Sequence, residues 1–247
     1  MAQLPDFITL DELGDLIEGQ VHPVILSYEN EHIATHHGVG TAFVLEHGGE
    51  LFVISAQHVL VSQYAKAEDL RIRLRNAPIS IVFDRKAVFV PDFDPDFDLL
   101  ILRILESQHE ALIAAGLSWI RATDIIQTEH QPSADVFRVF GYPDVGRAYD
   151  YDKQLLSAVL YSVNGVLVES TLPGLTTLKV VGDRPGEFRG MSGSVVIAET
   201  NDQWQFAGMV TLASDVNGLL NFIPAEKILY YLDRILMLEM TGEFLKD

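Results

Sequence analysis

The strongest constraint on the fold of this chain is a succession of short β-type runs separated by turn residues. Residues 40–45 (GTAFVL) and 51–56 (LFVISA) are rich in apolar residues, and His47-Gly-Gly-Glu50 between them has the composition of a tight turn. Two such runs joined by a glycine turn predict a β-hairpin. Comparable short runs follow at 71–74, 79–83, 87–90 and 99–104. We therefore expect the first half of the chain to be built from short strands.

A second series of β-type runs occupies the other half, at 136–140, 155–168, 175–181, 194–198 and 206–212. The polar stretch 122–134, which contains a proline, separates the two series. Strands in two sets, without a helix after each strand, favour paired barrels over an alternating α/β sheet. We expect a first barrel at 21–125 and a second at 126–247, after an N-terminal extension at 1–20.

Helical patterns are confined to three places. Leucines and isoleucine at helical spacing, with Thr9 and Glu12 as a capping box, predict a helix over 9–18. A helical interlude is expected over 107–115, and an amphipathic helix over 224–238 closes the chain. The predicted fold class is therefore all-β, with an N-terminal helix and a C-terminal helix.

Composition limits the function. The 247 residues are 48% hydrophobic and 21% charged, which is typical of a globular chain that can bury a core. A formal charge of −18 repels phosphate backbones and anionic lipids, so we expect no nucleic-acid partner and no membrane partner. The chain has no cysteine, which excludes disulfides, thiol nucleophiles and Cys-ligated metals. Together with the lack of a recognisable signal peptide, this favours a cytoplasmic location.

Three sites carry residues that could do chemistry. His58 follows the apolar run 51–56, Asp98 directly precedes the buried run at 99–104, and Ser192 has Gly190 and Gly193 around it. Taken singly, each has a structural interpretation: a surface histidine, a solvated turn, and a tight turn between strands.

Taken together, the three residues indicate nucleophilic catalysis. A serine nucleophile needs a base and a carboxylate that orients the base, and glycines beside it let backbone N–H groups converge on one point. No histidine follows Ser192, the last being His130, which excludes the Ser-Asp-His order of α/β-hydrolases.

In this order the motifs resemble those of the trypsin/chymotrypsin-like serine peptidases, and in texture their cysteine-poor bacterial branch that includes the high-temperature-requirement proteases. Five segments carry the resemblance: Gly40-Thr-Ala-Phe-Val-Leu with Ile54-Ser-Ala-Gln-His58-Val, Phe97-Asp98-Leu-Leu-Ile-Leu, Gly190-Met-Ser192-Gly-Ser, Ala207-Gly-Met-Val-Thr-Leu and Asn221-Phe-Ile-Pro-Ala. The resemblance implies two six-stranded antiparallel β-barrels with the site between them. It also implies that no cofactor or metal takes part.

The resemblance further implies a role for each residue. His58 would be the general base, Asp98 would orient it, and Ser192 would attack the acyl carbon. The backbone N–H groups of Gly190 and Ser192 would hold the oxyanion. Thr211 lies where the family usually has a serine that supports the aspartate.

Substrate contacts follow from the same resemblance. Residues Thr211, Leu212 and Ala213 would form the edge strand that pairs with a peptide. Glu187 aligns near the pocket for the residue before the scissile bond, where it would favour a basic side chain; it could equally point to solvent.

Departures from the family pattern lie around the nucleophile. Ser194-Val195 replaces Gly-Pro, which could loosen the oxyanion geometry, and Met191 replaces the aspartate that pairs with a newly cut N-terminus in secreted enzymes. We therefore expect no activation of that kind.

Two functions fit these observations. The first is a serine endopeptidase that acts on a protein or peptide through an acyl-enzyme. The alternative is a catalytically idle or partner-activated module of the same fold that binds peptides or proteins.

Overall fold

The computed structural model describes residue 17 and residues 19–27, 36–61, 65–66, 69–72, 88–89, 98–121, 136–150, 155–200 and 203–241. Three sequence predictions fall wholly or almost wholly outside these residues. They are the helix over 9–18, the strand over 79–83 and the boundary between the two halves at 125–126.

The described strands of the first half form one sheet in the order β2-β1-β3-β4-β7-β6, with β5 also paired to β1 and β8 to β3. Its strands are β1 (Val21–Ser27), β2 (His36–His37), β3 (Thr41–His47), β4 (Glu50–Ser55), β5 (Leu70–Ile72), β6 (Val88–Phe89), β7 (Leu100–Arg103) and β8 (Ile120–Arg121). The pairings are antiparallel except between β3 and β8. The predicted hairpin is confirmed as β3 and β4. Over the described residues this sheet does not close into a barrel.

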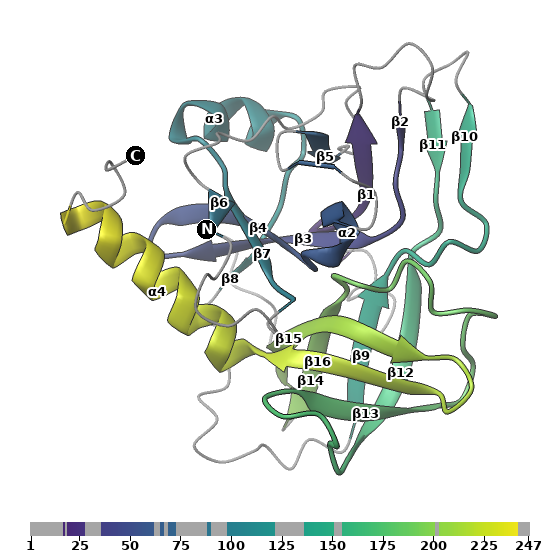
Figure 1. Ribbon diagram of the computed structural model, residues 1–247. Helices are drawn as coiled ribbons and strands as arrows, with labels where there is room; N and C mark the ends of the chain where they lie inside the picture. Colours follow the sequence, from purple (N-terminus) through teal and green to yellow (C-terminus); the bar gives the residue numbers. More distant parts are fainter. Residues whose placement is uncertain are drawn as a thin grey trace.

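The second half contains a closed six-stranded barrel in the order β12-β13-β16-β15-β14-β9 (Figure 1). Its strands are β9 (Val136–Gly141), β12 (Tyr161–Val168), β13 (Thr176–Val181), β14 (Val195–Thr200), β15 (Gln203–Ser214) and β16 (Leu219–Pro224). A separate hairpin joins β10 (Ala148–Asp150) and β11 (Leu155–Ser157). The single run predicted at 155–168 is therefore two strands that belong to different sheets.

Three helices are described: α2 (His58–Val61), α3 (Glu106–Ala114) and α4 (Ala225–Thr241). The last two confirm the predicted interlude and the predicted closing helix, and the all-β class with a C-terminal helix is confirmed. No helix in the described part of the chain has both the length and the apolarity needed to span a bilayer.

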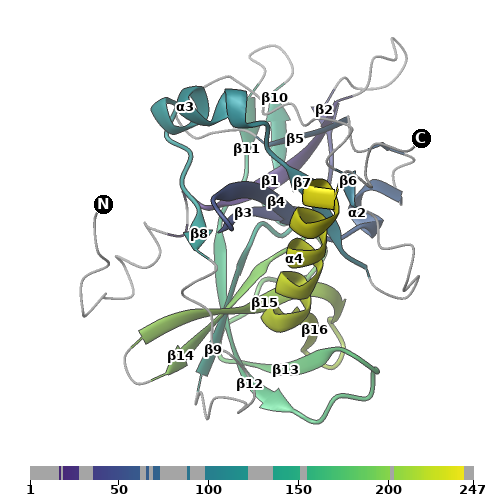
Figure 2. The same cartoon turned by 90° about the vertical axis from the view of Figure 1, so that its left-hand side faces the viewer.

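The closing helix α4 returns from the barrel to the first half (Figures 1 and 2). Its side chains Ile228, Leu232 and Ile235 are buried in the apolar cluster that forms the core of the first half. His47, at the end of β3, contacts Asp233 of α4 through Nε2 and Oδ1 at 2.6 Å. Because this cluster also contains residues from the outer face of the barrel, such as Phe206, the two halves and α4 share one apolar interface.

Truncation on the buried face of α4 tests this shared core. Leu232→Ala should lower the free energy of unfolding by about 2–5 kcal/mol, because a fully buried leucine leaves a cavity. Met237→Ala, on the same helix at a side chain that is 60% exposed, should change it by less than about 0.5 kcal/mol. Urea denaturation of both variants and the wild type measures the difference. Equal effects of the two substitutions would contradict the docking of α4.

Candidate active site

His58 and Asp98 meet because of the register between two strands. Ser55, the last residue of β4, lies opposite Leu100, the first residue of β7. The end of β4 and the start of β7 therefore lie side by side at the same end of the strand pair. His58 stands three residues after Ser55, and Asp98 stands two residues before Leu100. Val59 and Leu99, which follow the two polar residues, are buried and fix these ends of the chain.

Asp98 holds His58 through two hydrogen bonds. Its Oδ1 accepts from the backbone N–H of His58 at 2.8 Å, and its Oδ2 lies 2.5 Å from Nδ1 of the imidazole. The His58 side chain is 43% exposed and that of Asp98 is 21% exposed. A carboxylate bound to Nδ1 keeps the proton on that nitrogen and leaves Nε2 as the acceptor in the neutral ring. The arrangement therefore leaves Nε2, on the side of the ring away from Asp98, as the basic nitrogen.

Ser192 lies in a tight loop directly before β14. Met191 N donates to Phe188 O at 2.9 Å, Gly193 N to Val210 O at 2.8 Å, and Ser194 N to Met191 O at 3.0 Å. The side chain of Met191 is fully buried and belongs to the apolar cluster inside the barrel. The loop is thus held by apolar packing of Met191, the residue that replaces the aspartate of the secreted enzymes.

Two N–H groups of this loop are left without an acceptor among the described residues. They belong to Gly190 and Ser192, and they alternate with the N–H groups of Met191 and Gly193, which are bonded. A buried or half-buried N–H group without a partner is costly unless water or a ligand satisfies it. Two such groups two residues apart, beside a serine hydroxyl, can hold a negatively charged oxygen.

The orientation of the Gly190 peptide is fixed from outside the loop. The carbonyl of Arg189 accepts from the N–H of Asp144 at 2.7 Å, which turns this carbonyl toward the segment after β9. Gly190 has φ +92°, and a side chain there would lie 2.7 Å from the carbonyl oxygen of Tyr142. Only glycine fits both the conformation and the close approach.

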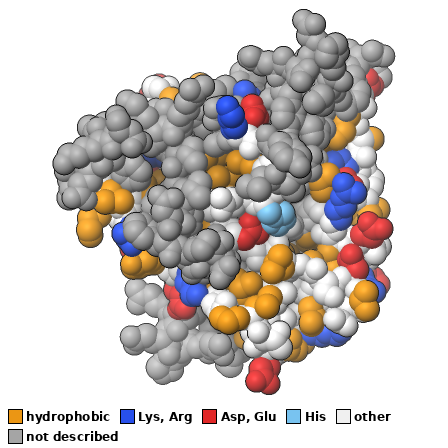
Figure 3. Space-filling view, viewed as in Figure 1, with side chains coloured by type: hydrophobic (Ala, Val, Ile, Leu, Met, Phe, Trp, Pro, Cys, Tyr) orange, Lys and Arg blue, Asp and Glu red, His pale blue; other side chains and the backbone are white. Residues whose placement is uncertain are grey.

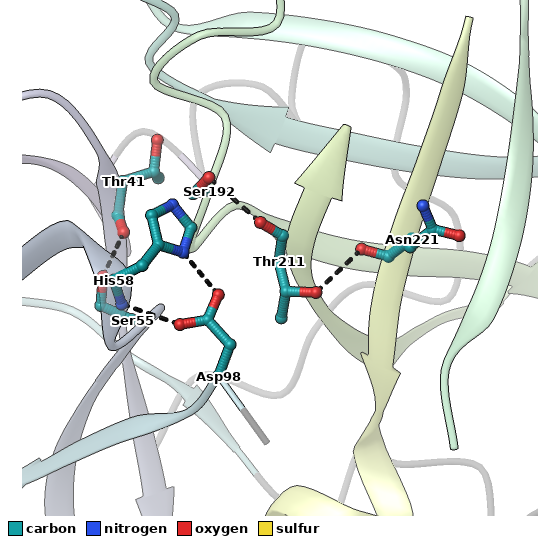
Figure 4. Close-up of polar contacts among 7 residues, drawn as sticks. All are labelled: Thr41, Ser55, His58, Asp98, Ser192, Thr211 and Asn221. Atoms are coloured by element: carbon teal, nitrogen blue, oxygen red, sulfur yellow. Dashed lines mark hydrogen bonds and ion pairs between the residues drawn. The ribbon is translucent and has the colours of Figure 1, made fainter. Parts of the chain in front are cut away.

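The hydroxyl of Ser192 donates to the carbonyl of Thr211 at 3.2 Å (Figure 4). Within the described part of the chain, no hydrogen bond joins Ser192 to His58. Figure 4 nevertheless shows the imidazole of His58 between the carboxylate of Asp98 and the side chain of Ser192. The structure therefore brings the three predicted residues to one place, with the serine turned toward Thr211.

The support that Thr211 was expected to give Asp98 is absent in the described residues, and this expectation is wrong. Thr211 Oγ1 instead lies 3.5 Å from the carbonyl oxygen of Asn221 in the neighbouring strand β16. The physical reason is an irregularity of β15, whose pairing with β16 shifts register between Val210 and Leu212.

The end of β15 borders the site as an edge strand. Leu212, Ala213 and Ser214 pair with β16 on one side, whereas the pairing of β15 with β14 ends at Met209. Leu212 is 48% exposed. On this face of the molecule a histidine side chain reaches the surface beside an acidic side chain and hydrophobic side chains (Figure 3). The edge expected at residues 211–213 is thus exposed from Leu212 onward.

The replacement of Gly-Pro by Ser194-Val195 is accommodated by Gly141. A side-chain carbon on Gly141 would overlap Ser194 Oγ, so the absence of that carbon makes room for the serine. Ser194 is fully buried, and its carbonyl accepts from Val210 N at 2.9 Å. The loop keeps its backbone bonds despite the altered sequence.

Two further expectations concern substrate and metal. Glu187 is exposed, in a segment joined to the turn after β15 by a hydrogen bond from Phe188 N to Asp215 Oδ1 at 2.6 Å. Among the described residues, no three histidine or acidic side chains gather into a group that could hold a metal ion.

Sequence reasoning missed the residues that connect the two halves at the site. Thr41 Oγ1 donates to the carbonyl of Gly190, 149 positions away, and accepts from Tyr142 N. Arg147 Nη1 and Nη2 donate to carbonyls that include those of Val24 and Gly40. A threonine that begins a buried run after a glycine is a weak signal, and nothing near Arg147 marks its partners.

Comparisons with known proteins support the architecture. No protein-family model matches the sequence, and no curated protein matches it. Human heparin binding protein is similar in structure, with a TM-score of 0.58, 14% identity and coverage of 88% of this chain and 91% of that chain. A scabies mite inactivated protease paralogue gives a TM-score of 0.57 at 12% identity, over 90% of this chain and 94% of that one.

A third similar structure comes from work on the coupled folding and binding of the Sesbania mosaic virus VPg protein. It gives a TM-score of 0.51 at 14% identity, over 87% of this chain and 90% of that chain. The chain therefore has the fold of trypsin-like serine proteases, with a closed second barrel and a first sheet that stays open over the described residues. An inactivated paralogue shares this fold, so the fold alone does not establish activity. The expected closeness to the bacterial high-temperature-requirement branch stays a prediction.

The close packing of the nucleophile loop can be tested at a glycine. Gly193 has φ +86°, and an added Cβ would lie 1.8 Å from the carbonyl oxygen of Thr41. Gly193→Ala should therefore cost at least about 2 kcal/mol of stability through strain and displacement of the loop. Gly186→Ala, where nothing lies within 4 Å, should stay within about 1 kcal/mol. Denaturation midpoints of the two variants decide between this packing and a loosely held loop.

Proposed function

We propose that this protein is a serine endopeptidase that hydrolyses peptide bonds through an acyl-enzyme. The observation that carries the proposal is the pair of bonds from His58 to Asp98, beside a serine in whose loop two N–H groups have no acceptor among the described residues. A base, an orienting carboxylate, an alcohol and an oxyanion site are the parts that acyl transfer needs. The trypsin-like fold supports the proposal, since His58 and Asp98 belong to the first half of the chain and Ser192 to the second.

The reaction proceeds in two steps, acylation of Ser192 and hydrolysis of the resulting ester. Rotation of the Ser192 side chain takes Oγ from the Thr211 carbonyl to Nε2 of His58, which accepts the hydroxyl proton as Oγ attacks the acyl carbon. The N–H groups of Gly190 and Ser192 bind the resulting oxyanion. His58 then gives the proton to the leaving amine, and the C–N bond breaks to leave an ester on Ser192. Water repeats the sequence with the ester, releasing the acid and restoring the serine.

The substrate is proposed to bind as an added strand. Backbone groups at the exposed edge of Leu212 and Ala213 can pair with an extended peptide. Thr211 is itself buried, but its carbonyl can accept from the peptide N–H nearest the nucleophile once the Ser192 hydroxyl has turned away. Glu187 is proposed to lie near the side chain before the scissile bond and to favour a basic residue there. The net charge of −18 acts in the same direction, by attracting basic partners at low salt.

One observation favours a second function. The Ser192 hydroxyl is bonded to the Thr211 carbonyl and not to His58, so the nucleophile and the base are not joined by a hydrogen bond in this arrangement. The alternative proposal is a module of the same fold that binds a peptide without turnover, or that becomes active only when a partner turns this hydroxyl. Tight peptide binding that Ser192→Ala leaves unchanged, without any hydrolysis, would support the idle module.

Covalent labelling tests the proposed chemistry directly. A fluorophosphonate probe should attach to Ser192, because it forms a stable phosphonyl ester with an activated serine. Labelling should vanish in Ser192→Ala and fall strongly in His58→Ala, and it should persist in Ser162→Ala, which removes an exposed serine on β12. Mass spectrometry of the labelled peptide identifies the site. A folded wild-type protein that takes up no probe, with or without cell extract, would refute the proposal.

Turnover gives a second test once a cleavable peptide has been found by library screening. Ser192→Ala should lower kcat by about 10⁶, as expected when one member of a cooperating set is removed. Asp98→Asn should also lower kcat strongly, because an amide can donate to Nδ1 and thereby place the proton on Nε2. The KM of the Asp98 variant should change much less than its kcat. A drop below threefold in kcat for either variant would argue against the assigned roles.

A further inference from the structure

Thr41 connects the first half of the molecule to the nucleophile loop more closely than any residue singled out from the sequence. It is the first residue of β3 and is fully buried. Its N–H and its hydroxyl donate to carbonyls of the second half. Its carbonyl accepts from Ser55 in the first half and lies against Gly193 in the second. The hydrogen bonds of these groups decide how the loop sits against the strand.

The N–H and the hydroxyl of Thr41 bind two carbonyls of the loop. Thr41 N donates to the carbonyl of Ser192 at 2.8 Å, and Thr41 Oγ1 donates to the carbonyl of Gly190 at 2.9 Å. Gly190 and Ser192 are the two residues whose N–H groups lack an acceptor among the described residues. Thr41 therefore holds the carbonyl end of each residue that is proposed to bind the oxyanion at its N–H end.

A second hydrogen bond holds the Thr41 hydroxyl in this position. Its oxygen also accepts from Tyr142 N at 2.8 Å, so both its donor and an acceptor site are in use. The carbonyl of Thr41 accepts from Ser55 Oγ at 2.8 Å and lies directly against Gly193. The hydrogen bonds of Thr41 with Tyr142 and Ser55 thus form one network, which holds the Thr41 hydroxyl and carbonyl in fixed orientations against the loop.

We propose that Thr41 is a positioning residue for the oxyanion hole. It acts by holding the carbonyls of Gly190 and Ser192, which fixes the peptide planes that directly follow these two residues. With those planes fixed, the N–H groups of Gly190 and Ser192, in the planes just before, keep their common direction toward the acyl oxygen. The inference rests on the proposed function. It adds that β3 of the first half contributes to the geometry of the hole, beside the bonds within the loop and the bond from Asp144 N to the carbonyl of Arg189.

A solely structural role makes a different prediction. A buried hydroxyl that satisfies Gly190 O and Tyr142 N stabilises the fold wherever it lies, and its loss removes one hydrogen bond from each of these groups. Such a role lowers the melting temperature without a selective effect on kcat below melting. A positioning role lowers kcat with little change in KM, because the oxyanion hole binds the transition state more strongly than the substrate.

The test compares Thr41→Val, which keeps the shape but lacks the hydroxyl, with Thr41→Ser, which keeps the hydroxyl. Thr177→Val is the matched control, since Thr177 is also buried and its hydroxyl donates to Asn221 Oδ1 at 2.7 Å in the barrel. The readouts are the second-order rate of fluorophosphonate labelling and the kcat and KM for a p-nitrophenyl ester, at a temperature where all variants are folded.

We expect Thr41→Val to lower the labelling rate and kcat by about tenfold to a hundredfold, the effect of a small displacement of reacting groups. KM should stay within about threefold, and Thr41→Ser should recover most of the rate, as positioning by the hydroxyl requires. Thr177→Val should react as the wild type does. Wild-type kinetics in Thr41→Val, or equal losses in Thr41→Val and Thr177→Val, would overturn the inference. Thr41→Ala replaces Thr41→Val if the valine variant does not fold.

A second measurement separates this inference from the proposed function. If the wild type takes up no probe, the proposed function fails, and the amide resonances of Gly190 and Ser192 in ¹H–¹⁵N NMR spectra then decide the role of Thr41. These resonances should shift in Thr41→Val, return in Thr41→Ser and stay in place in Thr177→Val. Unchanged resonances in Thr41→Val would overturn the positioning role without any reference to catalysis.

Discussion

The candidate site depends on one contact between the two halves of the molecule, the seating of the nucleophile loop against the start of β3. Gly193 lies so close to the Thr41 carbonyl that no side chain fits between them, and the Thr41 N–H binds the Ser192 carbonyl. The same strand pairs with β4, whose end leads to His58. The position of the serine relative to the imidazole is therefore set through two adjacent strands of one sheet.

Packing beyond the site keeps the halves in this relation. The apolar cluster that forms the core of the first half extends to the outer face of the barrel and to the buried side of α4, so a shift of one half would expose apolar surface. Arg147 reinforces the junction, because its guanidinium donates to the carbonyls of Gly38 and Gly40 in the first half and of Tyr142 in the second. The site thus lies on rigid elements, as preorganised hydrogen-bond donors require.

The local features of the fold could be predicted from the sequence. The hairpin of β3 and β4, the interlude α3 and the helix α4 follow from turn residues and periodicity, which act over a few neighbouring residues. The division of 155–168 into β11 and β12 was missed, because nothing in the run marks that its two parts pair with different partners. That the first sheet stays open over the described residues likewise depends on pairings among segments distant in the chain.

The sequence by itself determined which residues could do chemistry. His58, Asp98 and Ser192 occur at the ends of apolar runs and beside glycines, which is a local pattern. The tertiary structure alone decided how they are held: Asp98 by two bonds to His58, Thr211 by its bond to Asn221 and not to Asp98, and the loop by Thr41. Apart from the bond between His58 Nδ1 and Asp98 Oδ2, each of these bonds has a backbone group of another residue as at least one partner. Every residue carries the same backbone groups, so only the folded geometry selects which of them meet.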